Sequence, residues 1–244
     1  PKFDRLPEHI NIPARTAAAH ARLLEKLKNP AVLELLALNS RIILEGKNPE
    51  VGIITSGVSS AYVLEILNRG NAIEKVAVLE LGMIHPFPEK EVLSFLTGKY
   101  SKFLILEELD PIIENATRNI AQRNELNITI CGKGFSGLAS TGEFSLDLIT
   151  NVLGNFIETR AVDSALVPLE NVEQFLKNLP PRPPILCAGC PHRATFYLLK
   201  LAIPREESEL ILCGDIGCFG LGALPPLKMI DTINHMGMSI SMAQ

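Results

Sequence analysis

Several residues in the last quarter of the sequence have the types and spacing for metal or cofactor chemistry. Cys187 and Cys190 have the spacing with which a tight turn presents two thiolates to one metal ion or cluster. Cys218 follows in the glycine-rich stretch GDIGC, directly after the apolar run LILC. Because loops after neighbouring parallel strands share one edge of a sheet, we expect Cys218 to approach the other two cysteines. The candidates for a fourth ligand are Cys213, His192, His235 and residues beyond Gln244.

These cysteines allow four interpretations. A zinc site usually shows a second CxxC or a histidine pair, which this sequence lacks. A redox-active dithiol at a helix start would suit Cys187 and Cys190 but would leave Cys218 unexplained. Buried structural cysteines would need no ligand. Thiolates that line an iron–sulfur or cofactor pocket would account for all three, and the residues alone leave these possibilities open.

The stretch GDIGC also has the composition of a loop that lies against a ligand. Gly214 and Gly217 bracket Asp215, so the backbone can approach a bound group while the carboxylate orients it. No nucleophile with an adjacent base is visible in this region. An organic cofactor would therefore have to supply the reactive centre.

Two stretches in the first half of the chain follow predicted strands and contain polar residues. The turn TSGVSS at 55–60 presents backbone N–H groups at a helix start and could bind phosphate, although a plain strand-to-helix turn explains it as well. His85 lies between a strand end and Pro86, where ligand sites of parallel sheets occur, but a packed loop residue is equally expected there.

A group of carboxylates follows a third predicted strand. Glu107, Glu108 and Asp110 could serve acid–base or metal chemistry at the carboxyl end of the strand. A helix start at Pro111 favours acidic residues electrostatically, which explains them without catalysis. The sequence favours this second explanation and leaves the role of His85, Glu107 and Glu108 open.

The pattern of the chain predicts an α/β fold. From residue 50 on, short apolar runs alternate with stretches that are apolar at helical spacing. The predicted strands are 51–55, 75–81, 102–108 and 128–132, and the predicted helices are 61–70, 88–98, 111–123 and 140–156. Strands that are apolar throughout argue for a doubly wound parallel sheet with helices on both faces.

Composition shifts divide the chain into four regions. Residues 1–47 read as a helical lead-in, with helices at 13–27 and 31–44, and residues 48–160 as the doubly wound domain. A helix and a proline-rich linker follow at 161–183. Residues 184–244 open a second, incomplete α/β domain with strands at 185–187 and 209–213. Because the chain begins with Pro1 and stops in an apolar run, we expect a piece of a longer polypeptide.

Composition excludes several classes of protein. The chain has 244 residues, 47% of them hydrophobic, and a formal charge of −4. Because it has no cluster of basic residues, it lacks the positively charged surface that nucleic-acid binding requires. It has no window apolar enough for a bilayer and no secretory signal, so we expect no membrane association. Five cysteines, an odd number, are not distributed as a disulfide framework, so a cytoplasmic location is expected.

Taken in order, the stretches LCAGCPHR, GDIGC, LGALPPL and MGMSISMAQ are similar to the thiamine-diphosphate-binding region of 2-oxoacid:ferredoxin oxidoreductases. More narrowly, they resemble the alpha subunits of the indolepyruvate:ferredoxin branch. The earlier stretches PARTAAAHARLLEKL, VGIITSGVSSAYVLEIL, LELGMIHPFPEKEV and LILEELDPIIE resemble the transketolase C-terminal-like domain of that subunit. The resemblance covers essentially the whole chain.

The resemblance implies a reaction and a set of site residues. The reaction is oxidative decarboxylation of an aryl 2-oxoacid with coenzyme A, which yields an acyl-CoA, carbon dioxide and reduced ferredoxin. By the same resemblance, Cys187, Cys190 and Cys218 are candidate ligands of a four-iron iron–sulfur cluster. The residues implied to lie along thiamine diphosphate are Gly214, Asp215, Ile216, Gly217, Cys218 and Phe219, with Cys187 and His192 close by.

The resemblance also implies partners. These are a smaller beta subunit, ferredoxin and a small-molecule 2-oxoacid, in a hetero-oligomer. The Mg²⁺ ligands and the fourth cluster cysteine are expected after Gln244, and the glutamate that activates the cofactor before Pro1. His235 is an uncertain counterpart of a family histidine, because this chain has NHMGMS where relatives have an HGRALP-like segment. The alternatives are a 2-oxoacid oxidoreductase for pyruvate or branched-chain acids, and a non-catalytic interaction domain stabilised by zinc.

Overall fold

The computed structural model describes residues 12–69, 73–158, 176–180, 183–203 and 210–244. The chain divides into two compact units, unit 1 at 1–168 and unit 2 at 169–244. The predicted helix and proline-rich linker at 161–183 lie mostly outside the described residues, so that prediction is not tested.

Unit 1 contains a five-stranded sheet with the order β1-β3-β2-β4-β5. The strands β2 to β5 run parallel, and β1 pairs with β3 in the antiparallel direction at the edge of the sheet. The strands are β1 Ser40–Glu45, β2 Val51–Thr55, β3 Val76–Leu81, β4 Lys102–Leu106 and β5 Thr129–Cys131.

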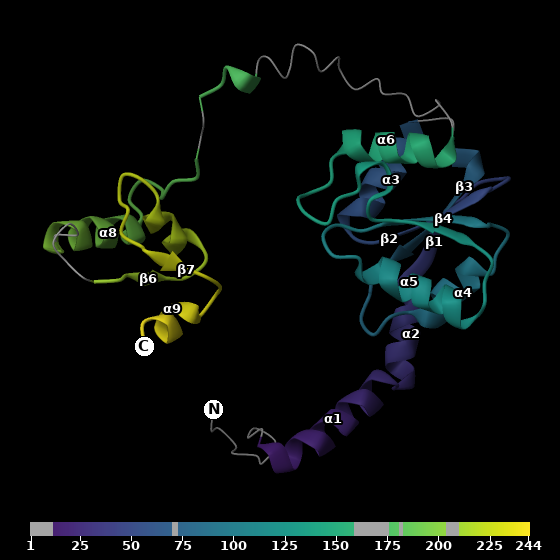
Figure 1. The fold of residues 1–244 in the computed structure, drawn as a ribbon, viewed down its shortest axis with the longest axis horizontal. Helices are drawn as coiled ribbons and strands as arrows, with labels where there is room; N and C mark the ends of the chain where they lie inside the picture. The colour runs from purple at the N-terminus through teal and green to yellow at the C-terminus, as the bar shows by residue number, and fades with distance from the viewer. Residues whose placement is uncertain (1–11, 70–72, 159–175, 181–182, 204–209) are drawn as a thin grey trace. The chain divides into compact units, whose positions relative to one another are not determined.

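Helices cover both faces of this sheet, as Figure 1 shows for unit 1. On one face lie α3 Val58–Arg69 and α6 Leu146–Ile157, and on the other lie α4 Glu89–Leu96 and α5 Ile112–Arg123. Neighbouring residues of β2 point to opposite faces, so Ile53 belongs to the first core and Ile54 to the second, both fully buried. The predicted doubly wound α/β fold is therefore confirmed.

Two predicted helices were wrong in extent. The stretch 31–44 was expected to be one helix. In the structure α2 (Pro30–Leu38) ends at Leu38, and β1 begins at Ser40. The residues of β1 gain ladder hydrogen bonds to β3, which outweighs their weak helical pattern. The helix expected at 140–156 begins only at Leu146, because the Ser145 side chain caps it by accepting from the N–H of Leu148 at 3.2 Å.

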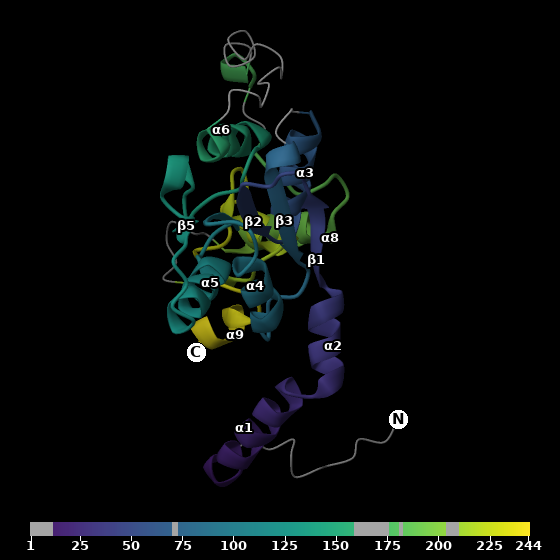
Figure 2. The ribbon, with the colours of Figure 1, turned by 90° about the vertical axis from the view of Figure 1, so that its right-hand side faces the viewer.

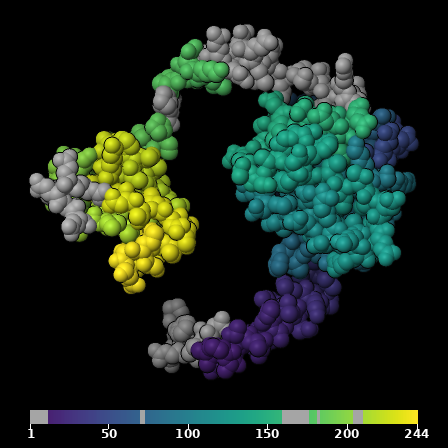
Figure 3. Space-filling view, in the orientation of Figure 1, coloured from purple at the N-terminus to yellow at the C-terminus, as the bar shows by residue number. Residues whose placement is uncertain are grey.

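The helices α1 Pro13–Leu27 and α2 continue away from the sheet at the N-terminal side of β1 (Figure 2). The side chain of Asn29 caps α2 by accepting from the N–H of Ala31 at 2.9 Å. None of the residues of α1 is buried, and in the space-filling view α1 stands clear of the sheet (Figure 3). No helix of the described residues is long and apolar enough to cross a membrane.

Unit 2 is built around a small apolar cluster of Leu186, Phe196, Met229 and Ile230. Its elements are α8 Pro191–Ala202, β6 Cys213–Gly214, the 3-10 helix η4 Cys218–Ala223, β7 Thr232–Ile233 and α9 Met238–Met242. β6 and β7 form a short parallel pair. The strand expected at 185–187 is absent from the described residues, and the one expected at 209–213 is reduced to β6.

Candidate functional site

The cysteine turn CAGC and the stretch GDIGC lie side by side in unit 2. Ring contacts between residues that directly follow each motif hold them together. The ring of Phe219 in η4 meets the ring of Phe196 in α8 at a centroid distance of 4.9 Å. The ring of His192 also packs edge-on against the ring of Phe219, at a centroid distance of 5.7 Å. The proximity of the motifs was predicted from adjacent strand ends, but it comes from the packing of η4 against α8.

The cysteines of the first motif form a tight turn. The N–H of Cys190 donates to the carbonyl oxygen of Cys187 at 3.2 Å, and Gly189 adopts a φ of +75°, which disfavours a side chain. Cys187 and Cys218 are exposed, whereas Cys190 is half-buried against the apolar cluster. The predicted turn is thus present, and Cys190 is the N-cap residue of α8.

The structure does not assemble these cysteines into a ligand set. Among the described residues, no three or more His, Cys, Asp or Glu side chains are grouped so that they could hold a metal ion. The cysteines present in this chain therefore do not by themselves fit an iron–sulfur cluster or a zinc ion. The assignment of Cys187, Cys190 and Cys218 as cluster ligands stays a prediction.

Asp215 has a structural partner. Its carboxylate accepts a hydrogen bond from the hydroxyl of Ser239 at 2.7 Å and from the N–H of Ser239 at 3.4 Å, at the start of α9. The hydrogen bond from the hydroxyl is the main reason that the pKa of Asp215 is lowered from its ordinary value. Asp215 thus fastens the GDIGC loop to α9, and its carboxylate is not free to orient a ligand.

The two glycines of this loop serve different purposes. A Cβ on Gly214 would lie 2.8 Å from the side chain of Ile230, so this glycine is required by packing. Gly217 has a φ of +118°, and no atom lies within 4 Å of where its Cβ would be. Ile216 is 49% exposed and Cys218 is exposed beside it. The loop therefore offers uncovered backbone flanked by apolar and sulfur atoms, which suits a flat cofactor.

The carboxylates that follow β4 accept hydrogen bonds from backbone N–H groups, and Glu107 stabilises the start of α5 in this way. Both oxygens of the buried Glu107 side chain accept, at 2.8 Å each, from the N–H groups of Ile113 and Glu114. Burial raises the pKa of Glu107, while these two N–H groups oppose the rise. Glu108 accepts from the N–H of Phe144 at 2.7 Å. The geometry of Glu107 thus agrees with the electrostatic explanation, whereas Glu108 holds the segment at Phe144 and does not contact α5 through this bond.

A lysine that the sequence analysis missed completes this network. The ammonium of Lys133 donates to the carbonyl oxygens of Glu107 and Ala139, and its backbone N–H donates to the Glu114 carboxylate at 2.8 Å. Burial lowers the pKa of Lys133, and the nearby carboxylates oppose this. A single lysine in a loop carries no motif or periodicity, so no sequence signal could have identified it.

The two remaining stretches show no ligand geometry. His85 is exposed in the loop after β3. In the turn TSGVSS, α3 begins already at Val58, so Ser59 and Ser60 are buried helical residues. The plain strand-to-helix turn is therefore the simpler description of this stretch.

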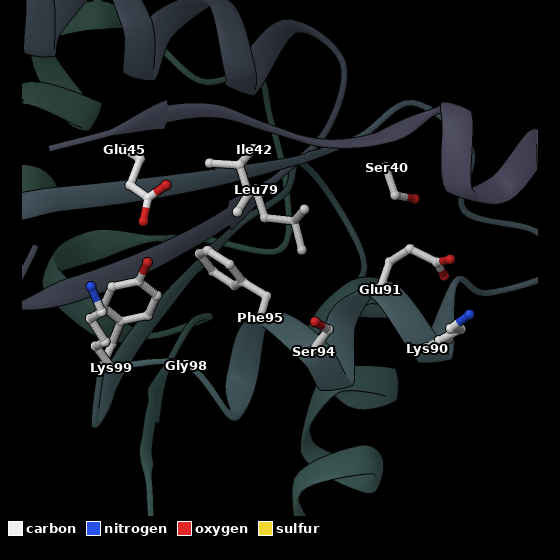
Figure 4. A pocket seen from close by; sticks show the side chains of 11 residues that line it. Ser40, Ile42, Glu45, Leu79, Lys90, Glu91, Ser94, Phe95, Gly98 and Lys99 are labelled. Atoms are coloured by element: carbon white, nitrogen blue, oxygen red, sulfur yellow. The ribbon is translucent and has the colours of Figure 1, made fainter.

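A hollow of about 410 Å³ lies in unit 1 between β1 and α4 (Figure 4). Apolar side chains of Ile42, Leu79 and Phe95 lie between charged groups at its two ends. Those charged groups are Glu45, Lys90, Glu91 and Lys99. None of the predicted site residues lines this hollow, so it is separate from the candidate site in unit 2.

Comparison with known proteins gives one consistent result. The chain is similar to indolepyruvate oxidoreductase subunit IorA of Methanothermobacter thermautotrophicus (31% identity over 242 residues), of Pyrococcus horikoshii (35% over 244) and of Thermococcus kodakarensis (36% over 243). These matches cover 98–99% of this chain and 36–37% of each relative. The chain thus spans a little over a third of the length of these curated relatives.

Two further comparisons add little. No protein-family model matches the chain. A solved structure of a split-gene transketolase, an inactive β4 tetramer, is 20% identical, covers 52% of this chain and 41% of its own, and has a TM-score of 0.35. A likeness of this size carries no argument about the site.

Proposed function

Because the chain resembles subunit IorA over nearly its whole length, as the sequence motifs predicted, we propose that it is part of a thiamine-dependent 2-oxoacid oxidoreductase. The substrate we propose is an aryl 2-oxoacid of the indolepyruvate type. The observation that carries the proposal is the match across 98–99% of the chain. The contact of the two motifs through His192 and Phe219 supports it.

The residues of unit 2 are compatible with thiamine diphosphate. We propose that the backbone at Gly217 and the side chains of Ile216, Cys218 and Phe219 form one wall of its site. When bound, the cofactor supplies a nucleophilic carbon and a sink for the electron pair that carbon dioxide leaves behind. The open space beside Gly217 would let the cofactor approach the backbone, which a side chain there would prevent.

The other residues of the motifs would shape this wall. Asp215 holds the loop against α9 through Ser239, and Phe219 holds it against α8 through Phe196 and His192. The loop is thus fixed from two sides, which limits its motion when a ligand binds. Such positioning lowers the entropy that binding would otherwise cost.

The remaining parts of the proposal come from the resemblance alone. They are Mg²⁺ held by residues outside this chain, coenzyme A as co-substrate, ferredoxin as acceptor and a smaller beta subunit in a hetero-oligomer. The cytoplasmic location that we propose rests instead on the distribution of the cysteines. We do not extend the proposal to an iron–sulfur cluster on Cys187, Cys190 and Cys218, since the described residues do not gather a ligand set.

A substrate profile tests this function. The natural protein that carries the chain, with its partner subunit, would be supplied with thiamine diphosphate, Mg²⁺ and coenzyme A. Reduction of ferredoxin or of a dye would then be followed with indolepyruvate, pyruvate and a branched-chain 2-oxoacid. We expect the highest kcat/KM with indolepyruvate. Preference for pyruvate or the branched-chain acid would reassign the substrate, and no turnover of any 2-oxoacid would contradict the proposal.

A further inference from the structure

A second hollow in unit 2 lies beside the first two turns of α8. It has a volume of about 510 Å³, within the usual range for small-molecule sites, and is lined by Cys190, Arg193, Tyr197, Pro226 and Leu227, among others. A smaller hollow of about 100 Å³ adjoins it and shares Arg193, Pro226 and Leu227. Together they form one surface whose walls are mainly apolar.

This surface lies on a different side of α8 from the GDIGC loop and η4. His192 and Phe196, four residues apart, face Phe219 in η4. Arg193 and Tyr197 have the same spacing but are each one position further along the helix, so they face about 100° away. The turn of α8 that contacts the GDIGC loop therefore also presents Arg193 to the hollow.

Arg193 is the single charged residue among those that line the two hollows. Within the described part of the chain, its guanidinium makes no hydrogen bond or ion pair with another residue. By contrast, Lys200, about two turns further along α8, donates to the carbonyl oxygen of Pro226 and so secures the opposite wall. One unpaired guanidinium at a helix N-terminus attracts an anion and matches the two oxygens of a carboxylate.

The apolar part of the lining indicates which kind of uncharged group the ligand carries beside its anionic group. Tyr197 is 57% exposed, and Pro226 and Leu227 lie in the same lining. Flat apolar groups gain most from such a surface, since rings stack on rings and exclude water. The single positive charge of Arg193 neutralises a ligand with one negative charge. It would leave most of the charge of a diphosphate without a partner, which disfavours a diphosphate in this hollow.

We propose that the hollow beside Arg193 binds an arylcarboxylate, with the carboxylate on the guanidinium and the ring against Tyr197 and Leu227. An aryl 2-oxoacid has this chemistry, so the choice of ligand rests on the proposed function. The hollow would then hold the substrate by its carboxylate next to the turn that borders the GDIGC loop.

The chain contains no tryptophan, which provides a direct test. The fluorescence anisotropy of indole-3-acetate, an unreactive analogue, would report its binding to the whole chain without a background from tryptophan. We expect saturable binding that Arg193→Gln weakens about tenfold, the usual effect of losing a charge-assisted hydrogen bond. Arg193→Lys should restore part of the affinity, and Tyr197→Ala should weaken it several-fold. Neutral indole should bind wild type and Arg193→Gln equally weakly.

Arg22→Gln, a change of an exposed arginine in α1, is the matched control and should leave the affinity unchanged. Absence of saturable binding to wild type, or equal affinity in Arg193→Gln, would overturn the inference. If Arg193→Gln fails to fold by circular dichroism, Arg193→Lys and Tyr197→Ala still decide the question. Thiamine diphosphate binding without indole-3-acetate binding would refute this inference alone, and the reverse result would refute the thiamine part of the proposed function alone.

Discussion

Glu107 is expected to be the most sensitive polar position of unit 1. Its buried carboxylate accepts from the N–H groups of Ile113 and Glu114 at 2.8 Å each. In Glu107→Ala both N–H groups lose their partner, at about 1–3 kcal/mol each. Removal of a buried carboxylate offsets part of this loss, so we expect a decrease of about 2–4 kcal/mol in the free energy of unfolding. For a unit of this size, the melting temperature should fall by about 5 to 15 °C.

Urea unfolding followed by circular dichroism measures this change. Asp110→Ala, an exposed acid of the same loop, is the control and should remain within about 0.5 kcal/mol of wild type. Burial raises the pKa of Glu107, so wild-type unit 1 should lose stability as the pH rises through that pKa. Glu107→Ala should lack this dependence. An unfolding free energy unchanged by Glu107→Ala would refute the assignment of the carboxylate as the partner of α5.

Two further predictions concern unit 2. A Cβ in Gly222→Ala would lie 2.4 Å from the ring of Phe196, so we expect a loss of about 1–3 kcal/mol in urea unfolding; Gly220→Ala, whose nearest contacts are 3.3 Å, should lose less. Asp215→Asn should loosen α9, seen as faster amide hydrogen exchange at Ser239. Because the folded pKa of Asp215 is lowered, its stabilisation is present above the ordinary value of about 3.9 and disappears as the pH falls through the folded pKa. The exchange difference between wild type and Asp215→Asn should therefore vanish in strong acid, and a difference independent of pH would contradict the role of the carboxylate.

The strands of unit 1 could be predicted because their pattern is local. Runs such as Val51–Thr55 and Lys102–Leu106 are apolar throughout, and a strand buried on both faces needs that composition. The strand β1 was missed, although the polar residues Asn39, Ser40 and Arg41 interrupt the apolar pattern after α2. Its conformation depends on pairing with β3, whose residues lie about 35 positions further along the chain.

The candidate site was predictable in composition but not in detail. The sequence indicated that GDIGC lies near the cysteine turn; the contact of His192 with Phe219 joins the residues that follow the two motifs, while the approach of Cys218 to Cys187 and Cys190 stays a prediction. The reason was wrong, since packing of Phe219 on α8 replaces the expected strand ends. The partner of Asp215 was also beyond prediction, because Ser239 lies 24 residues away in a five-residue helix.

The central claim is that this chain forms part of a thiamine diphosphate site. The direct measurement is a calorimetric titration of the natural protein, with its partner subunit and Mg²⁺, with thiamine diphosphate. We expect saturable binding that is weakened in Gly217→Val, which fills the open space beside the loop, and retained in Gly142→Val, a glycine of unit 1 that also has a positive φ. Absence of saturable binding to the wild-type protein, or equal affinity in Gly217→Val, would contradict the account.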